Sequence, residues 1–425
     1  MFRFRAGSLP HTIFLWSAAL TLLLTCSLAL AAERSRGKQL VTDFWRADTV
    51  EQRQQAARQL QAAAPDVATL YQWLKAGPDY ARDVPTGTLE YARYNADGLR
   101  FPYVLLVPDD YDPDQSYPVE FMLHGGVSRP PWQDGQQWWR RGYDSLRYPD
   151  RITVVPASWN EAFWWFANQA ENLPAILKSV KQQYNVNENR VYLTGVSDGG
   201  TGTYFFAFRQ PTHWAAYMPY IGHMAVLRNR DAGGGHPLFF DNLTAKPLYI
   251  VNGEDDPLYP VYAVRPYIDY LEQAKVPHVF KAIFEGGHNT NWLPEETPLI
   301  EKFKEENPRD PLPDSVLWIT ESAANYQRNH WLRIDEMLEE GQPGKVEVLR
   351  DGNILTVKAT YVTAFTLLLN PEEIDFNQAV QVEVNGTLVL DKKLEQSAQT
   401  LLKWAAEDLD RSMLFTAELA LRTPQ

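Results

Sequence analysis

A serine with a glycine two positions to either side stands near the middle of the chain, in the pentapeptide Gly195-Val196-Ser197-Asp198-Gly199. Residues 191–193 before it predict a buried strand, and residues 201–208 after it predict a helix. A serine on a sharp strand-to-helix turn needs small neighbours, because the chain doubles back on itself there. We therefore predict that Ser197 is a nucleophile and that the N–H of Asp198 faces the negative charge developing on the attacked group. An ordinary glycine-rich turn is the alternative.

A pair of glycines follows another predicted strand. Residues 119–123 run directly into His124-Gly125-Gly126. Glycines at a strand end let backbone N–H groups approach a ligand closely. Alone, this pattern indicates a common glycine turn. In a chain that also has a serine on a sharp strand-to-helix turn (a nucleophile elbow), it predicts an oxyanion hole formed by Gly125, Gly126 and Asp198.

A serine hydroxyl is a weak nucleophile, so it needs a base to take its proton and an acid to orient that base. His288 follows one predicted strand in a glycine turn, and Asp256 follows the predicted strand before it. We prefer Asp256 to Asp255 and Glu254 because it lies far enough past its strand to fold back towards the histidine. The order of these residues along the chain, each after a predicted strand, predicts a catalytic triad of Ser197, Asp256 and His288. A solvated acidic turn and a surface histidine are the alternatives.

Predicted strands and helices alternate over residues 86–311. Such alternation predicts an α/β fold, with a mostly parallel sheet flanked by helices and with one site along the carboxyl edge of the strands. A helical segment is expected before it, over 33–85. Short strands, with hairpin turns at Asp351-Gly352-Asn353 and Asn385-Gly386, predict an all-β, sandwich-like domain over 312–425. This domain either binds carbohydrate or packs against the main domain.

Tryptophans are concentrated before the predicted elbow strand. Trp159, Trp164 and Trp165 are interleaved with polar residues, as in a cleft for a ring-bearing group such as a sugar or an aromatic acid. Packing in the core is the alternative, and it is the more common role of such residues. The three are our predicted substrate-binding residues.

The first residues have the features of an export signal. Arg3 and Arg5 precede an apolar run over 13–30, and Ala29-Leu30-Ala31-Ala32 contains an A-x-A cleavage site. We predict a signal peptide at residues 1–32 and a secreted or periplasmic protein. An uncleaved N-terminal anchor is the alternative.

Composition limits the expected partners. The 425 residues carry a formal net charge of −13 and have a pI near 5.2. Nucleic acid and anionic membranes are bound by clustered Lys and Arg, so we expect neither partner, and no membrane contact once the signal is removed. Cys26 is the only cysteine and lies in the predicted signal, so we expect no disulfide in the mature chain. Lipid attachment at Cys26 is poorly supported because Thr25 precedes it.

From about Leu89 to Glu306, roughly half of the 425 residues, the chain resembles the α/β-hydrolase superfamily, and within it the secreted esterases similar to polyhydroxybutyrate depolymerases and feruloyl esterases. The motifs that carry the resemblance are His124-Gly125-Gly126, the elbow pentapeptide with Gly200, the acid turn Gly253 to Pro257, and Gly286-Gly287-His288. The resemblance implies the α/β-hydrolase fold, a serine nucleophile with a histidine base and an aspartate orienter, and no metal or cofactor. It implies a small-molecule or polymeric ester substrate, carbohydrate-linked esters included, cleaved through an acyl-enzyme.

Two other functions stay open. Prolyl-oligopeptidase-type serine peptidases share the same order of serine, aspartate and histidine. A non-catalytic binding protein on a hydrolase scaffold is the second alternative, which the intact set of Ser197, Asp256 and His288 disfavours.

Overall fold

The structure is a computed structural model that describes residues 36–133, 135–140, 142–143 and 147–424. The chain divides into a compact unit that ends at Asp79 and a second that begins at Tyr80, so the N-terminal unit ends six residues before the predicted boundary at 85. The predicted signal peptide, with Cys26, lies outside the described residues. None of the described helices is long and apolar enough to cross a membrane.

The N-terminal unit is helical, as predicted, and contains two short helices on either side of Pro65. Helix α2 spans Val50–Ala63 and α3 spans Val67–Ala76. The first begins with a capping box, in which the Thr49 hydroxyl accepts the N–H of Gln52 and the Gln52 side chain accepts the N–H of Thr49. Proline lacks a backbone N–H and disfavours a helical residue before it, which separates the two helices.

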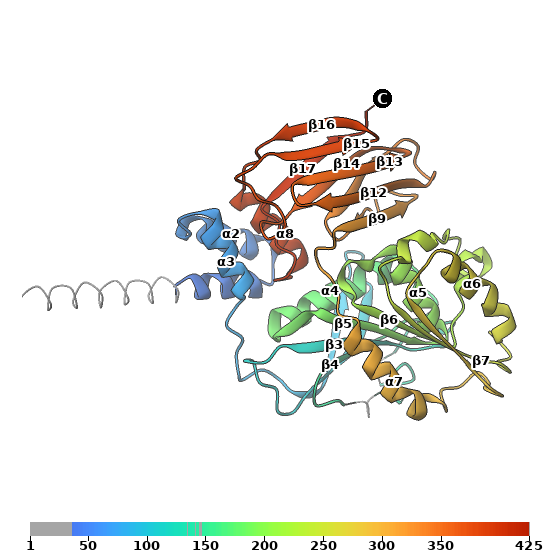
Figure 1. Ribbon diagram of the computed structural model, residues 1–425. Coiled ribbons are helices and arrows are strands. Elements are labelled where there is room, and N and C mark those ends of the chain that lie inside the picture. Colours follow the sequence, from blue (N-terminus) through green and yellow to red (C-terminus); the bar gives the residue numbers. More distant parts are fainter. Residues whose placement is uncertain (1–35, 134, 141, 144–146, 425) are drawn as a thin grey trace, which may run out of the picture. The chain divides into compact units, whose positions relative to one another are not determined.

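The second unit contains an eight-stranded sheet with the strand order β1-β2-β4-β3-β5-β6-β7-β8 (Figure 1). β2 pairs antiparallel with β1 and with β4, whereas the other neighbours run parallel. The strands are β1 Gly87–Tyr94, β2 Arg100–Val107, β3 Tyr117–Leu123, β4 Ile152–Pro156, β5 Val186–Val196, β6 Ala216–Tyr220, β7 Leu248–Gly253 and β8 His278–Ile283. This mixed, mostly parallel sheet is that of the predicted α/β-hydrolase fold.

Different helices cover the two faces of this sheet. Val191 and Leu193 of β5 lie in one core with α4, α5 and α6, whereas Tyr192 lies in a second core with α7. Successive side chains on a strand point to opposite faces, so the alternation builds both cores from one strand. Figure 1 shows α7 on the opposite side of the sheet from α5. The helices are α4 Ala167–Gln183, α5 Asp198–Arg209, α6 Val261–Gln273 and α7 Leu293–Glu306.

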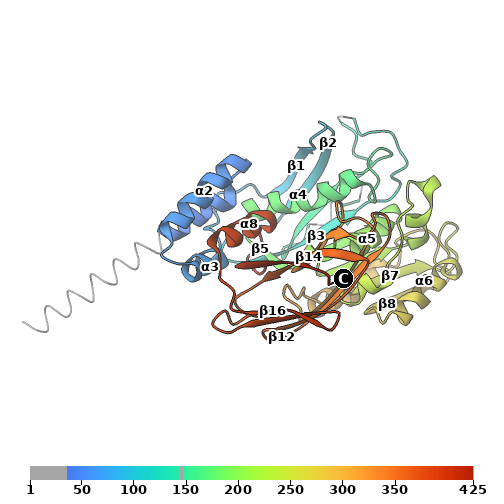
Figure 2. The same ribbon diagram turned by 90° about the horizontal axis from the view of Figure 1, so that it is seen from above.

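The C-terminal part is the predicted sandwich-like β-domain. One sheet has the order β10-β11-β14-β17 and the other β16-β15-β13-β12-β9, with one apolar core built from their strands. The strands are β9 Ser315–Thr320, β10 Arg328–Asn329, β11 Leu332–Met337, β12 Gly344–Asp351, β13 Ile354–Thr360, β14 Val362–Leu369, β15 Val380–Val384, β16 Thr387–Lys392 and β17 Ala417–Arg422. Helix α8 (Ala398–Asp408) was not predicted. It lies beside α4 (Figure 2). Lys178 of α4 and Glu407 of α8 form an ion pair of 3.7 Å.

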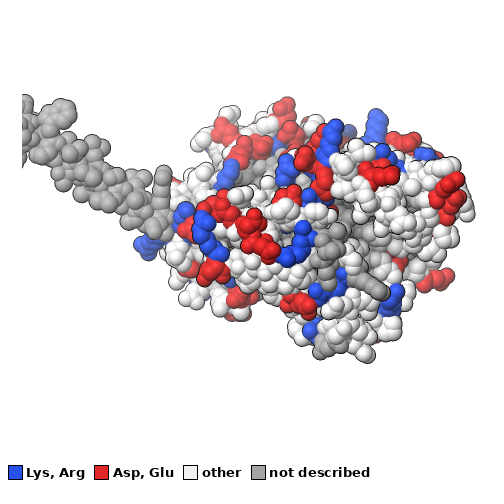
Figure 3. All heavy atoms as spheres, turned by 90° about the horizontal axis from the view of Figure 1, so that it is seen from below, with Lys and Arg blue, Asp and Glu red and all other residues white. Residues whose placement is uncertain are grey.

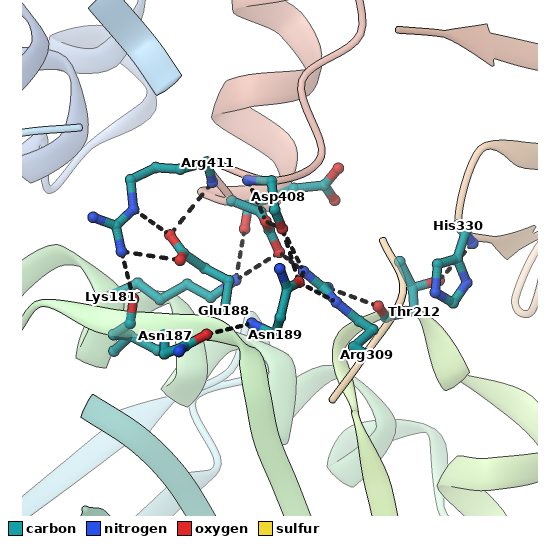
Figure 4. A network of polar contacts seen from close by, with 12 residues as sticks. Lys181, Asn187, Glu188, Asn189, Thr212, Arg309, His330, Asp408 and Arg411 are labelled. Atoms are coloured by element: carbon teal, nitrogen blue, oxygen red, sulfur yellow. Dashed lines mark hydrogen bonds and ion pairs between the residues drawn. The ribbon is translucent and has the colours of Figure 1, made fainter. Parts of the chain in front are cut away.

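A buried polar network joins the β-domain to the domain that contains the eight-stranded sheet (Figure 4). The Asp410 carboxylate of the β-domain accepts hydrogen bonds from Arg309 at 2.8 Å and Lys181 at 3.4 Å. Beside it, Arg411 Nε lies 2.6 Å from Glu188 Oε1. Burial raises the pKa of the Asp410 carboxyl, but Arg309 and Lys181 outweigh that effect and hold the pKa well below its usual value. Removing one partner would leave a buried charge unpaired, so the network favours one arrangement of the two domains.

Charges of both signs are mixed on the surface. On the face shown in Figure 3, Lys and Arg are interspersed with Asp and Glu and do not form a continuous basic area. A protein that tracks a phosphate backbone presents such an area. That nucleic acid is not a partner stays a prediction.

Candidate active site

Ser197 lies between β5 and α5 in a backbone conformation that is uncommon for residues with a side chain, with φ 58° and ψ −118°. The turn is tight. A Cβ at Gly195 would lie 2.0 Å from the carbonyl oxygen of Gly199, and a Cβ at Gly199 would lie 2.0 Å from that of Leu123. Both positions therefore require glycine. The strained turn presents the Ser197 hydroxyl at the carboxyl end of the central strands.

The structure brings Ser197, His288 and Asp256 together. His288 Nε2 lies 2.8 Å from Ser197 Oγ, and His288 Nδ1 lies 2.7 Å from Asp256 Oδ2. The other Asp256 oxygen accepts the N–H groups of Leu258 and Tyr259, at 2.8 and 3.0 Å. A neutral imidazole with its proton on Nδ1 satisfies both contacts, and this form accepts a proton from the serine.

The loops after β7 and β8 determine which acid reaches the histidine. The N–H of Glu254 donates to the Ile283 carbonyl and the N–H of Asp255 to the Gly286 carbonyl, at 3.0 and 2.9 Å. These bonds tie the two loops together and leave both side chains exposed. Asp256, one residue further, is buried with 1 % of its surface exposed. The preference for Asp256 over its two acidic neighbours therefore agrees with the geometry.

Side chains hold successive peptide groups of the glycine turn after β3. The indole N–H of Trp164 donates to the His124 carbonyl at 2.9 Å, and His124 Nδ1 lies 2.9 Å from the Gly125 carbonyl. The N–H of Val127 donates to the Asp198 carboxylate at 2.9 Å. In a trans peptide the C=O and the following N–H point in opposite directions. Fixing the two carbonyls therefore fixes the directions of the two glycine N–H groups.

The predicted oxyanion donors lie in the two segments next to the nucleophile. A Cβ at Gly125 would lie 2.7 Å from Ser197 Cβ and 3.3 Å from Ser197 Oγ, and Gly126 follows it with φ 68°. Asp198 is the first residue of α5, so its N–H has no acceptor within the helix. Charge developing near Ser197 Oγ would meet these dipoles.

His124 is a site residue that the sequence analysis did not single out. The residue is 4 % exposed, and its Nε2 accepts the N–H of Ser158 at 3.0 Å. Burial lowers the pKa of the ring to about 4, so the ring is neutral at neutral pH. With Nε2 accepting, the proton is on Nδ1 and is donated to the Gly125 carbonyl. The feature of the sequence that could have identified His124 is its position between a predicted strand and two glycines.

The prediction that three tryptophans bind substrate is wrong in the structure. Trp159, Trp164 and Trp165 are 2, 0 and 2 % exposed, so their rings offer no face to a ligand. Trp164 packs against α5, where a Cβ at Gly202 would lie 2.3 Å from Trp164 Cβ. Trp165 donates its indole N–H to the Ala232 carbonyl at 3.1 Å. Packing, the stated alternative, describes all three, and Trp164 also supports the glycine turn.

An aromatic ring does adjoin the triad, but from another segment. Tyr259 follows the acid turn, is half-buried, and meets the His288 ring edge-on at 5.8 Å. Burial, followed by the charges of Asp198 and Asp256, raises the pKa of its hydroxyl to about 12, so it is a neutral phenol. Its sequence signal, a tyrosine three residues after the acid, is too weak to distinguish it from other tyrosines.

A serine elbow after β5, an acid after β7 and a histidine after β8 define the site of an α/β-hydrolase-fold protein. Comparisons with known proteins agree with this class. The chain matches no protein-family model. It is 27 % identical over 164 residues to a probable feruloyl esterase C of Aspergillus niger, over 37 % of this chain and 56 % of that protein. A probable feruloyl esterase C of Aspergillus terreus is 25 % identical over 172 residues, with the same coverage of 37 % and 56 %.

The chain spans about half the length of these curated relatives, 56 % in each case. Among solved structures, a thermostable esterase is 24 % identical and covers 52 % of this chain and 63 % of its own, with a TM-score of 0.42. A ferulic acid esterase of Anaeromyces mucronatus is 14 % identical and covers 50 % and 88 %, with a TM-score of 0.40. Because these TM-scores are low, the fold assignment rests on the strand order of the chain itself.

Proposed function

We propose that this protein is a serine hydrolase that cleaves carboxylic esters through an acyl-enzyme on Ser197. The observation that carries the proposal is the continuous chain of contacts from Ser197 through His288 to Asp256, at 2.8 and 2.7 Å. The similarity to probable feruloyl esterases supports an ester as the substrate. The proposed catalytic groups are side chains and backbone N–H groups of this chain, and water is the second substrate.

In the first half of the reaction, Ser197 Oγ attacks the ester carbonyl carbon while its proton passes to His288 Nε2. Asp256 stabilises the imidazolium that forms. The oxyanion is stabilised by the N–H of Asp198 and by the glycine N–H groups of the turn after β3. His288 then protonates the departing alcohol as the C–O bond breaks, which leaves the acyl group on Ser197.

The second half repeats these steps with water. His288 takes a proton from a water molecule, whose oxygen attacks the acyl carbon. The bond to Ser197 Oγ breaks, the serine recovers its proton from His288, and the carboxylic acid leaves.

Ester cleavage is proposed to dominate over amide cleavage. An amine is a worse leaving group than an alkoxide and must be protonated as it departs. The substrates to compare are aryl and acetyl esters, feruloylated sugars, hydroxyalkanoate oligomers and peptidyl-proline amides. Preferential turnover of the amides would replace this proposal with the peptidase alternative.

We also propose that the protein is exported, because Arg3, Arg5 and the Ala29 to Ala32 site in its sequence are typical of a signal peptide. N-terminal sequencing of the protein purified from the periplasm or medium measures this. A mature chain that begins near residue 33 is expected. A protein that stays in the cytoplasm with its first 32 residues would contradict it.

A fluorophosphonate probe tests the nucleophile directly. The folded wild-type protein should be labelled, and Ser197→Ala should not. Ser197→Ala and His288→Ala should each lower kcat by about 10⁶, and the double variant should cost little more, because the residues act as a unit. Asp256→Asn should lower kcat by about 10⁴.

Circular dichroism spectra that match the wild type are the control for folding in each variant. A folded wild-type protein that the probe does not label would support the binding-protein alternative. Strictly additive losses for Ser197→Ala and His288→Ala would show that the two residues do not work together. Full activity in Asp256→Asn would move the acid to Asp255 or Glu254.

A further inference from the structure

Arg129 folds back over the glycine turn beside the nucleophile. A Cβ at Gly126 would lie 3.6 Å from Arg129 Nε and 3.7 Å from Nη2, and a Cβ at the preceding Gly125 would lie 3.3 Å from Ser197 Oγ. Consecutive Cα atoms are about 3.8 Å apart, so the guanidinium lies within reach of a short substituent on a substrate bound at Ser197. Its charge also acts on His124, whose pKa is lowered first by burial and further by Arg129.

Within the described part of the chain, the Arg129 side chain is oriented by stacking, and no hydrogen bond from its guanidinium to another residue is found. The Arg129 guanidinium lies over the Trp138 ring, 5.1 Å from the centroid, and that ring meets His124 edge-on at 5.3 Å. The Arg129 carbonyl accepts the N–H of Asn160 at 2.9 Å, which fixes the backbone. Stacking on an aromatic face orients a guanidinium and leaves its planar fork of N–H groups available.

Among the residues that the structure describes, no carboxylate lies within ion-pair distance of this guanidinium. By contrast, Arg151, Arg309 and Arg328 each contact a carboxylate, at 2.9, 2.8 and 2.8 Å. The neighbouring Asp198 carboxylate accepts the N–H of Val127 instead. Arg129 is therefore an exposed, oriented cation at the edge of the site.

We infer that Arg129 forms an anion subsite beside the nucleophile, so that the preferred esters carry a carboxylate in their acyl or their alcohol part. This inference rests on the proposed function and adds a substrate class to it. A guanidinium binds a carboxylate through two parallel N–H···O bonds. The net charge of −13 opposes an anionic substrate at long range, but salt screens that repulsion beyond about 8 Å. At short range the charge of Arg129 therefore determines which esters the site prefers.

The test compares esters that differ in one charge. The 4-nitrophenyl half-esters of succinic, glutaric and adipic acid carry a carboxylate in the acyl part, and the butyrate, valerate and hexanoate are their neutral counterparts. For the alcohol part, 4-acetoxybenzoate is paired with 4-acetoxybenzamide. The wild-type protein should cleave at least one anionic ester with a kcat/KM about tenfold above its counterpart, mainly through a lower KM. Arg129→Gln should reduce this ratio about tenfold, and Arg129→Lys should retain part of it.

The matched control is Arg422→Gln on β17, which removes the same charge from a side chain that is 76 % exposed and should preserve the ratio. Raising the ionic strength from about 0.01 to 0.5 M should reduce the wild-type ratio, because the contact is exposed to solvent. Equal kcat/KM values within every pair for the wild type, or an unchanged ratio in Arg129→Gln, would overturn the subsite.

Binding separates this inference from the proposed function. Ser197→Ala lacks the nucleophile and should bind the glutarate half-ester about tenfold more tightly than the valerate in isothermal titration, and adding Arg129→Gln should abolish the difference. A wild type that cleaves no ester, while Ser197→Ala shows this difference, would overturn the proposed function alone. Turnover without any preference would overturn the subsite alone, and neither turnover nor differential binding would overturn both.

Discussion

His124 has both ring nitrogens bonded to backbone groups, which one neutral tautomer satisfies. Nδ1–H donates to the Gly125 carbonyl at 2.9 Å, and Nε2 accepts the N–H of Ser158 at 3.0 Å. The first bond sets the direction of the following N–H, that of Gly126, through the planarity of the peptide. At the scale of single residues, His124 is therefore a positioning residue for the proposed oxyanion hole.

Substitution of His124 should change kcat more than KM. His124→Leu removes the bond to the Gly125 carbonyl, and we expect kcat to fall about tenfold with little change in KM, because the oxyanion donors act mainly in the transition state. His124→Asn keeps an amide donor near the Nδ1 position and should recover part of the loss. Steady-state kinetics with one neutral aryl ester measure both variants. Equal decreases of kcat in His124→Leu and His124→Asn, or a change in KM without a change in kcat, would contradict this role.

At the scale of elements, the start of α5 and the glycine turn after β3 are coupled by one side chain. Asp198 begins α5, and its carboxylate accepts the N–H of Val127 at 2.9 Å. The proposed oxyanion donors belong to these two segments, so a change in their separation would change the distance of every donor from the substrate. A displacement of such donors weakens transition-state stabilisation steeply.

Asp198→Ala should lower kcat about tenfold, because the turn loses its link to α5. Asp198→Asn keeps an acceptor oxygen for Val127 and should retain most of the activity, apart from a small loss of favourable charge at the helix N-terminus. The measurement is kcat and KM for one neutral ester, with the circular dichroism spectrum as the control for folding. If Asp198→Asn lost as much activity as Asp198→Ala, the charge rather than the hydrogen bond would be responsible.

At the scale of the whole molecule, buried charges lie where the catalytic domain meets the β-domain. Lys246, just before β7, is 4 % exposed, and its Nζ lies 3.5 Å from Nδ1 of His330 in the β-domain. Burial, followed by repulsion from Arg309, lowers the pKa of Lys246 to about 7 from a usual value of 10.5. A charged lysine here costs folding free energy.

The stability of the protein should therefore rise with pH above neutrality. Below pH 7 Lys246 is charged in the folded and unfolded chains, and the folded chain carries the full cost of burying that charge. Between pH 7 and 10.5 the unfolded chain keeps a proton that the folded chain has lost, so the free energy of unfolding rises by up to about 1.4 kcal/mol per pH unit. Lys246→Met should be more stable than the wild type at pH 7 and should show a smaller rise.

Urea denaturation at pH 7, 8 and 9 measures these slopes. Lys358→Met removes an exposed lysine on β13 and should preserve the wild-type slope. The idea fails if Lys246→Met rises with pH as steeply as the wild type, or if it is less stable at pH 7.

Features that depend on local geometry could be predicted from the amino-acid sequence alone. Gly195 marks the elbow because a Cβ there would lie 2.0 Å from the carbonyl oxygen of Gly199, four residues further on, a requirement that a five-residue pattern carries. The alternation of strands and helices predicted the parallel sheet, because period-two and helical apolar patterns are written in consecutive residues. Asp256 and His288 could be placed at the same edge as Ser197 because the carboxyl ends of parallel strands meet there.

Which side chains are buried, and what they contact across long separations in sequence, depends on how the whole chain folds. Trp164 has the same type and polar neighbours whether its ring lines a cleft or packs on Gly202, and the packing of α5 buries it. The contacts between Arg309 and Asp410 and between Trp164 and His124 join residues 101 and 40 positions apart. No periodic pattern in the sequence spans such separations. These contacts depend on how whole helices and strands pack together, and that packing reflects the summed burial of many side chains rather than any short motif.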